Sequence, residues 1–124
     1  MDLSSWHVLV VEDERDSAQV VSEILTHNGI RVDVARNGYE CLDMLQEFEP
    51  TLIVMDLAMP EMDGWQTLME IRANPTTAHI PVVAVTAYHS ANVAQDALHA
   101  GFNAYFSKPL HPVRFMEAIV KLAN

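Results

Sequence analysis

The chain has 124 residues, of which 50% are hydrophobic and 19% are charged, so we expect one packed domain over residues 1–124 and exclude intrinsic disorder. Its 17 acidic and 7 basic side chains leave a net charge of −10, which predicts no binding to nucleic acid or to an anionic membrane surface. The single cysteine, Cys41, excludes a disulfide framework. With no signal-peptide pattern and no apolar stretch of membrane-spanning length, we expect a cytoplasmic protein.

Short apolar runs recur along the chain and predict a sheet. The runs at residues 8–11, 52–55 and 82–85 are unbroken, which is typical of parallel strands buried on both faces. Residues 31–34 alternate between polar and apolar side chains, as expected for an edge strand. Residues 103–106 are a weaker candidate for the opposite edge.

Helical patterns fill the intervals between these strands. Their expected limits are a stop at Asn28-Gly29, a capping box of Asn37 and Glu40, a start near Asp63-Gly64, a stop at Gly101 and a first turn at Pro112. Five β–α units in succession imply right-handed parallel crossovers. We therefore predict an α/β fold of the flavodoxin-like (βα)5 kind, a three-layer α/β/α sandwich with parallel sheet order 2-1-3-4-5.

Acidic residues follow two of the strands expected at the centre of that sheet. Glu12 and Asp13 follow the first strand and Asp56 follows the third. Their carboxylates should therefore converge at the carboxyl ends of the strands, where open parallel sheets have their ligand-binding and active sites. Three carboxylates in one place either have raised pKa values or are neutralised by a divalent cation. Oxygen ligands suit Mg²⁺, and the same geometry would accept Mn²⁺. Zinc is a poor candidate, because the six histidines include no i, i+4 pair.

Two further polar residues follow the remaining strands at the same edge. Thr86 follows the fourth strand and its hydroxyl can donate to a phosphoryl oxygen. Lys108, after the fifth strand, is a mobile point charge suited to that oxygen or to Asp56. A surface lysine or threonine is ordinary when it stands alone. Together with the acids, these residues form a phosphoryl-transfer constellation in which a carboxylate is the nucleophile.

The chain closely resembles the receiver domain of two-component response regulators, and most of all the stand-alone, chemotaxis-type regulators. The matching segments are VLVVED at 8–13, MDLAMP at 55–60, MDG at 62–64, PVVAVTA at 81–87, GFNAY at 101–105 and SKP at 107–109. They follow one another in the right order and cover essentially the whole chain.

This resemblance implies a phosphorelay function. Asp56 would be the phosphorylation site, taking its phosphoryl group from a histidine kinase or a histidine phosphotransfer protein. Glu12, Asp13 and Asp56 would hold Mg²⁺, with the backbone carbonyl of Ala58 as a further ligand. Thr86 and Lys108 would bind the phosphoryl group.

The resemblance also implies how the signal is passed on and ended. Thr86 and Tyr105 would be the switch residues, and the peptide bond before Pro109 would be cis. A downstream protein would bind the face formed by the fourth helix, fifth strand and fifth helix. Ala58 and Tyr88 stand where many relatives carry polar or acidic side chains, so both positions bear on the rate of dephosphorylation.

The sequence leaves three alternative functions to be considered. The chain can be a receiver domain cut from a larger hybrid kinase or multidomain regulator, although its initial methionine argues mildly against that. A Mg²⁺-dependent phosphohydrolase working through an aspartyl phosphate would need an acid two residues after the nucleophile, where Ala58 stands. A flavodoxin would need a Ser/Thr/Gly-rich loop after the first strand, where Glu12 and Asp13 would repel the phosphate of FMN.

Overall fold

Five parallel strands form one sheet in the order β2-β1-β3-β4-β5, as the sequence predicts. The computed structural model describes residues 2–123. Side chains of the three central strands are buried almost throughout, whereas the two edge strands are partly exposed. The strands are β1 (His7–Val11), β2 (Arg31–Ala35), β3 (Leu52–Asp56), β4 (Val82–Thr86) and β5 (Ala104–Ser107).

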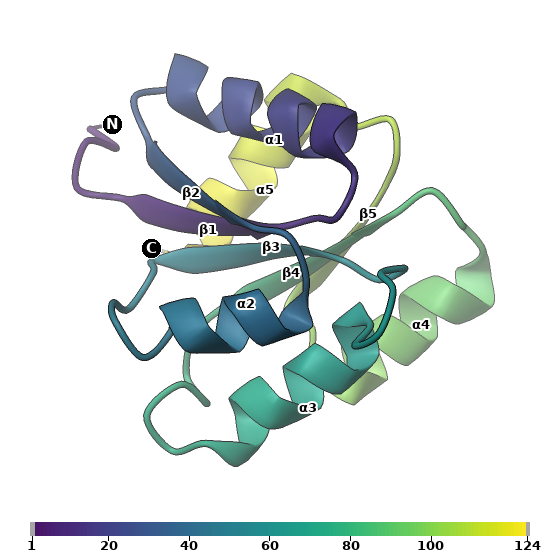
Figure 1. Ribbon diagram of the computed structural model, residues 1–124. Coiled ribbons are helices and arrows are strands. Elements are labelled where there is room, and N and C mark those ends of the chain that lie inside the picture. Colours follow the sequence, from purple (N-terminus) through teal and green to yellow (C-terminus); the bar gives the residue numbers. More distant parts are fainter. Residues whose placement is uncertain (1, 124) are drawn as a thin grey trace.

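Helices cover both faces of the sheet, so the predicted three-layer sandwich is confirmed (Figure 1). α1 and α5 pack on one face, and α2, α3 and α4 pack on the other. Neighbouring residues of each central strand point to opposite faces, so that Val10 packs beneath α1 and α5 while Val11 packs on the other side. The helices are α1 (Arg15–His27), α2 (Gly38–Met44), α3 (Gly64–Ala73), α4 (Ala91–Ala100) and α5 (Pro112–Ala123).

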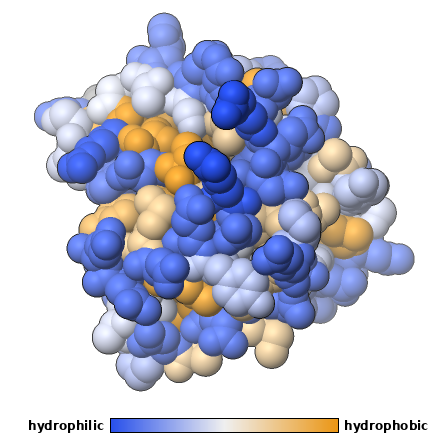
Figure 2. Space-filling view, viewed as in Figure 1, coloured by the Kyte–Doolittle hydropathy of each residue, from blue (hydrophilic) through white to orange (hydrophobic). Residues whose placement is uncertain are grey.

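Polar side chains dominate the face of the molecule seen in Figure 2. Figure 2 shows a mainly hydrophilic face on which hydrophobic side chains form small, separate patches. Among the described residues, none of the helices combines the length and the apolar character needed to cross a membrane.

The helix limits follow local hydrogen bonds. At the start of α2 the Asn37 side chain accepts from the backbone N–H of Glu40 at 2.8 Å. The return bond from the Glu40 side chain is not among those of the described residues, so the predicted capping box is only half formed. Asp63 and Gln66 form a complete capping box at the start of α3. Gly101 ends α4 in the left-handed region, with φ 114°, as its position predicts.

Six strand ends differ from the prediction by one residue. β1 begins at His7 rather than at residue 8, β2 ends at Ala35 rather than at residue 34, and β5 ends at Ser107 rather than at residue 106. Asp56 and Thr86 are the last residues of β3 and β4 rather than the first residues after them, and β5 begins at Ala104 rather than at residue 103. The reason lies in the pairing, because Asp56 lies opposite Val85 and Thr86 lies opposite Ser107 in the sheet. The backbones of both residues are therefore held by the sheet rather than by a mobile loop.

Candidate functional site

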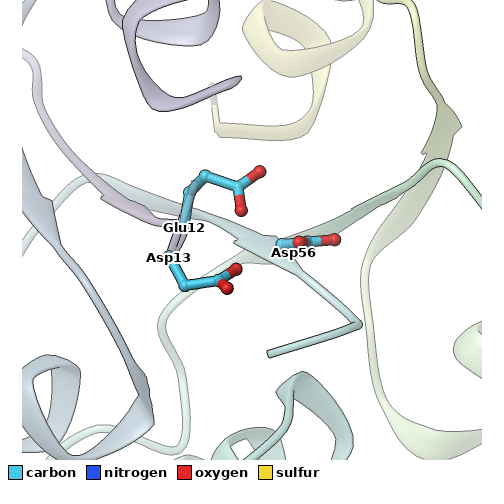
Figure 3. A group of neighbouring side chains, drawn as sticks. All are labelled: Glu12, Asp13 and Asp56. Carbon is cyan, nitrogen blue, oxygen red and sulfur yellow. The ribbon is translucent and has the colours of Figure 1, made fainter. Parts of the chain in front are cut away.

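The carboxyl end of the sheet brings together the three acids singled out in the sequence. Val11, the last residue of β1, pairs with Met55 of β3. The residues that follow them in the chain, Glu12 and Asp56, therefore lie side by side. The carboxylates of Glu12, Asp13 and Asp56 converge (Figure 3), and one oxygen of each lies within 4.8 Å of the others. Glu12 and Asp56 are buried, whereas Asp13 is exposed.

Burial governs the charge of Glu12. Its side chain is 4% exposed, and desolvation, together with the neighbouring carboxylate of Asp56, raises the pKa of Glu12 to about 7. Two contacts oppose this rise: the ammonium group of Lys108 donates to Oε1 at 2.5 Å, and the backbone N–H of Glu14 donates to Oε2 at 3.2 Å. The metal-free site is therefore poised between a charged and a neutral Glu12 near physiological pH.

Lys108 enters the site from the turn after β5. Its Nζ lies 3.8 Å from Asp56 Oδ2, farther than it lies from Glu12. Its backbone N–H donates to the carbonyl of Thr86 at 2.9 Å, which fixes the base of the side chain. Burial alone would lower the pKa of Lys108, but the hydrogen bond to Glu12 and the charge of Asp56 together raise it. The Lys108–Pro109 peptide bond is cis, as predicted.

Thr86, Ala58 and Tyr88 share a hollow beside the acids. The hollow has a volume of about 490 Å³ and is also lined by Asp63 and Trp65. Thr86 is buried, and its Oγ1 accepts from the backbone N–H of Tyr88 at 3.0 Å. The Tyr88 side chain is 74% exposed. Ala58 and Tyr88, which we expect to bear on the rate of dephosphorylation, therefore lie beside the hydroxyl of Thr86, which we expect to bind the phosphoryl group.

Gly64 lets α3 approach Asp56 closely. A Cβ atom at this position would lie 2.4 Å from the carbonyl oxygen of Asp56 and 2.9 Å from the Cα of Leu57. The Gly64 N–H in turn donates to the carbonyl of Leu57 at 3.0 Å. Only glycine permits this contact, which holds the chain just after Asp56 against the first turn of α3.

Tyr105 lies on β5, apart from the acids. Its ring is half-buried against the core beneath α2, α3 and α4. Its hydroxyl lies 3.0 Å from Nδ1 of His89, and the two rings stack with centroids 5.7 Å apart. His89 was not predicted from the sequence, because a histidine in a polar loop carries no signal that a distant tyrosine is its partner.

The oxygen donors present fit Mg²⁺. Carboxylates are hard ligands that this ion prefers, and their mutual spacing lets one ion contact all three. Burial, and after it the neighbouring carboxylate of Asp56, raises the pKa of Glu12, and a bound cation would favour its charged form. The described residues bring Glu12, Asp13, Asp56 and Lys108 together as the sequence predicts.

The fold and this site define a class: parallel α/β proteins with an acid cluster and a lysine at the carboxyl edge of the sheet. The family model of the response regulator receiver domain matches residues 8–120. An uncharacterized 14.6 kDa protein from the sodA1 3′ region of Leptolyngbya boryana is 37% identical over 117 residues, which are 94% of this chain and 89% of that protein. The polar-differentiation response regulator DivK of Brucella anthropi is 34% identical over 112 residues, 90% of this chain and 91% of DivK.

A solved structure agrees with these sequence relatives. The signal receiver domain of a signal transduction histidine kinase from Syntrophus aciditrophicus superposes with a TM-score of 0.87 at 28% identity, covering 96% of this chain and 90% of that one. The chain therefore belongs to the family of response regulator receiver domains. Such domains are phosphorylation-activated signalling switches that interact with histidine kinases or phosphotransfer proteins and with downstream targets. They typically bind Mg²⁺ at an acidic site and are generally not enzymes.

Proposed function

We propose that Asp56 is the phosphoryl acceptor of this receiver domain. The observation that carries the proposal is the convergence of Glu12, Asp13 and Asp56 with Lys108 at the carboxyl edge of the sheet. A carboxylate oxygen of Asp56 attacks the phosphorus of a phosphohistidine in a histidine kinase or phosphotransfer protein. The new P–O bond forms as the P–N bond breaks, and the imidazole leaves with the electron pair of that bond and takes up a proton.

The other site residues have distinct roles in this transfer. Glu12, Asp13, Asp56 and the carbonyl of Ala58 hold Mg²⁺, or Mn²⁺ in its place, and the ion supplies neutralisation of the charge that builds up on the phosphoryl oxygens. Lys108 adds its ammonium charge, and its flexible stem lets it turn from Glu12 to an oxygen on Asp56.

Thr86 and Tyr105 carry the signal away from the site. Thr86 turns its hydroxyl toward a phosphoryl oxygen and Tyr105 changes position in response. A ligand can only favour a state that the protein already samples, so phosphorylation shifts an existing equilibrium. The output is the binding of a downstream protein to the face formed by α4, β5 and α5.

A stand-alone regulator is the form we favour, with a cytoplasmic location. The 112 residues matched in DivK make up 91% of that relative, so DivK is about as long as one receiver domain. The free thiol of the buried Cys41 is in keeping with a reducing compartment. A receiver domain of a larger hybrid kinase is the second candidate, because the Syntrophus aciditrophicus neighbour belongs to a histidine kinase.

Intact-mass measurement after incubation with phosphoramidate and Mg²⁺ tests the acceptor. We expect the wild type to gain one phosphoryl group and Asp56→Asn to gain none, because the amide lacks the nucleophilic oxygen. Asp43→Asn, which changes an exposed acid of α2, is the matched control and should behave as the wild type. Equal phosphorylation of Asp56→Asn and the wild type would contradict the proposal.

A further inference from the structure

The loop between β4 and α4 connects the two proposed switch residues. At one end, Thr86 Oγ1 accepts from the backbone N–H of Tyr88 at 3.0 Å. At the other end, Nδ1 of His89 lies 3.0 Å from the hydroxyl of Tyr105, with the two rings stacked at an interplanar angle of 29°. Four consecutive residues, 86–89, therefore link the hydroxyl of Thr86 to the hydroxyl of Tyr105.

Only the side chain of Thr86 is free to change its partner. Its backbone is held in β4 opposite Ser107, and its carbonyl accepts from the N–H of Lys108 at 2.9 Å. When the hydroxyl turns away to donate to another oxygen, it no longer accepts from Tyr88. The loop then loses the bond that fixes it next to β4, while the strand itself stays in place.

We propose that His89 is a positioning residue that holds Tyr105 in its resting position until Thr86 turns toward the phosphoryl group. The inference rests on the proposed function, because it takes the movement of Thr86 from there. His89 lies three residues after Thr86, so movement of the loop carries the imidazole away from Tyr105. The half-buried ring of Tyr105 then loses both its hydrogen bond and its stacking partner and is free to change position.

The chemistry of the His89–Tyr105 pair, which we call the latch, allows the hydrogen bond with either tautomer of the imidazole. In one neutral tautomer Nδ1 accepts from the tyrosine hydroxyl, and in the other tautomer or the cation it donates to the same oxygen. His89 is exposed, so this bond has a modest strength in water. Losing it should change the resting equilibrium by roughly two- to tenfold, which is measurable without unfolding the protein.

Beryllium fluoride with Mg²⁺, a mimic of the phosphoryl group, provides the test. Whatever stabilises the resting state opposes binding of the mimic, since coupling between two sites is reciprocal. We therefore expect His89→Ala and Tyr105→Phe each to lower the half-saturating beryllium concentration, measured at a fixed excess of fluoride, by roughly two- to tenfold. The double variant should show no further gain. His89→Asn, whose amide can take the place of Nδ1 but cannot stack on the tyrosine ring, should move the value back toward that of the wild type. His99→Ala, an exposed histidine of α4, is the matched control.

Fluorine NMR of 3-fluorotyrosine-labelled protein gives an independent reading of the position of Tyr105. Without the mimic, the Tyr105 resonance of His89→Ala should lie closer to the saturated wild-type position than that of the wild type or His99→Ala. The latch is overturned if His89→Ala matches His99→Ala in both measurements, if it binds the mimic more weakly, or if the two single effects simply add. If the latch fails in this way but the Tyr105 resonance of the wild type still shifts when the mimic binds, the proposed switch role of Tyr105 stands. If the Tyr105 resonance of the wild type does not shift, both the switch role of Tyr105 and the latch are overturned.

Discussion

The ammonium nitrogen of Lys108 lies 2.5 Å from Glu12 Oε1, so the lysine is hydrogen-bonded to Glu12 rather than to Asp56, the proposed acceptor. Glu12 has the greatest need of a partner, because its side chain is 4% exposed and a lone buried charge is costly. A group that neutralised Glu12 would free the ammonium for Asp56 Oδ2, which lies 3.8 Å away. The hydrogen bond between Lys108 and Glu12 therefore belongs to the unphosphorylated site without metal.

Replacing Lys108 tests this pairing. We expect Lys108→Met to lower the free energy of unfolding by about 3 kcal/mol at pH 8 without metal, because it leaves the charge of Glu12 buried and unpaired. At pH 5.5 the loss should be smaller, since Glu12 is then protonated in the folded protein. Urea denaturation at the two pH values measures both losses. Lys121→Met, an exposed lysine of α5, is the control, and an equal loss at both pH values would show that the pairing is not electrostatic.

The raised pKa of Glu12 also predicts how stability depends on pH. Between the ordinary value of 4.5 and about 7, the folded protein holds a proton on Glu12 that the unfolded chain has released. The contribution of Glu12 to the free energy of unfolding therefore falls as pH rises through this window, and the full penalty is present above it.

Mg²⁺ should offset the loss of stability caused by the buried charge of Glu12, because the ion binds the deprotonated carboxylate of Glu12. We expect the rise in melting temperature produced by millimolar Mg²⁺ to be larger at pH 8 than at pH 5.5. Glu12→Gln should flatten the pH dependence of the metal-free protein and reduce the response to Mg²⁺. If the variant keeps the wild-type slope across this window, the pH dependence comes from other groups.

Much of the fold was predictable because its signals are local. Central strands such as β3 read as unbroken apolar runs, and helix limits such as Gly101 follow from backbone preferences of single residues. The acids were predictable too, since topology alone sends Glu12 and Asp56 to the same edge of the sheet. Strand ends were less certain, because whether Asp56 and Thr86 lie inside the sheet depends on pairing across strands.

Contacts between distant polar side chains were not predictable. Arg72 of α3 donates to the carbonyl of Gly101 at 2.9 Å and to the carbonyl of Ile80 at 2.8 Å, and so ties the end of α3 to the chain around α4 and β4. Burial lowers the pKa of Arg72. In the sequence this arginine is indistinguishable from an exposed one, because its acceptors are backbone carbonyls and the side-chain amide of the distant Asn103. The contact of His89 with Tyr105 escaped prediction because the two side chains lie 16 residues apart in the sequence and meet only in the folded protein.

Gly64 offers a test of the packing behind the acceptor. Because a Cβ would meet the carbonyl of Asp56 at 2.4 Å, Gly64→Ala should push α3 away from β3 and destabilise the fold by about 2 kcal/mol. It should also slow phosphorylation by displacing Asp56. The control is Gly29→Ala, where φ is +82° and nothing lies within 4 Å of the added atom. That variant should cost about 1 kcal/mol through backbone strain and phosphorylate normally, so equal phosphorylation rates in the two variants would refute the packing argument.

The hollow beside Thr86 predicts a long-lived phosphorylated state. Hydrolysis needs a water in line with the phosphorus, and Ala58 has no group to hold one, while Tyr88 is bulky and can cover the approach. Phosphate loss in Mg²⁺ should be faster in Ala58→Asn, and fastest, by about tenfold or more, in Ala58→Asn/Tyr88→Glu. If the wild type loses phosphate as fast as the double variant, these two side chains do not set the lifetime.

Borohydride trapping tests the identity of the acceptor most directly. Borohydride reduces an aspartyl phosphate to homoserine, and peptide mapping then locates the reduced residue. After incubation with acetyl phosphate and Mg²⁺, the proposed site predicts homoserine at position 56 and at no other position, with none in Asp56→Asn. Homoserine at position 13, or an equal yield of reduced residue in Asp56→Asn, would contradict the assignment of Asp56 as the phosphoryl acceptor.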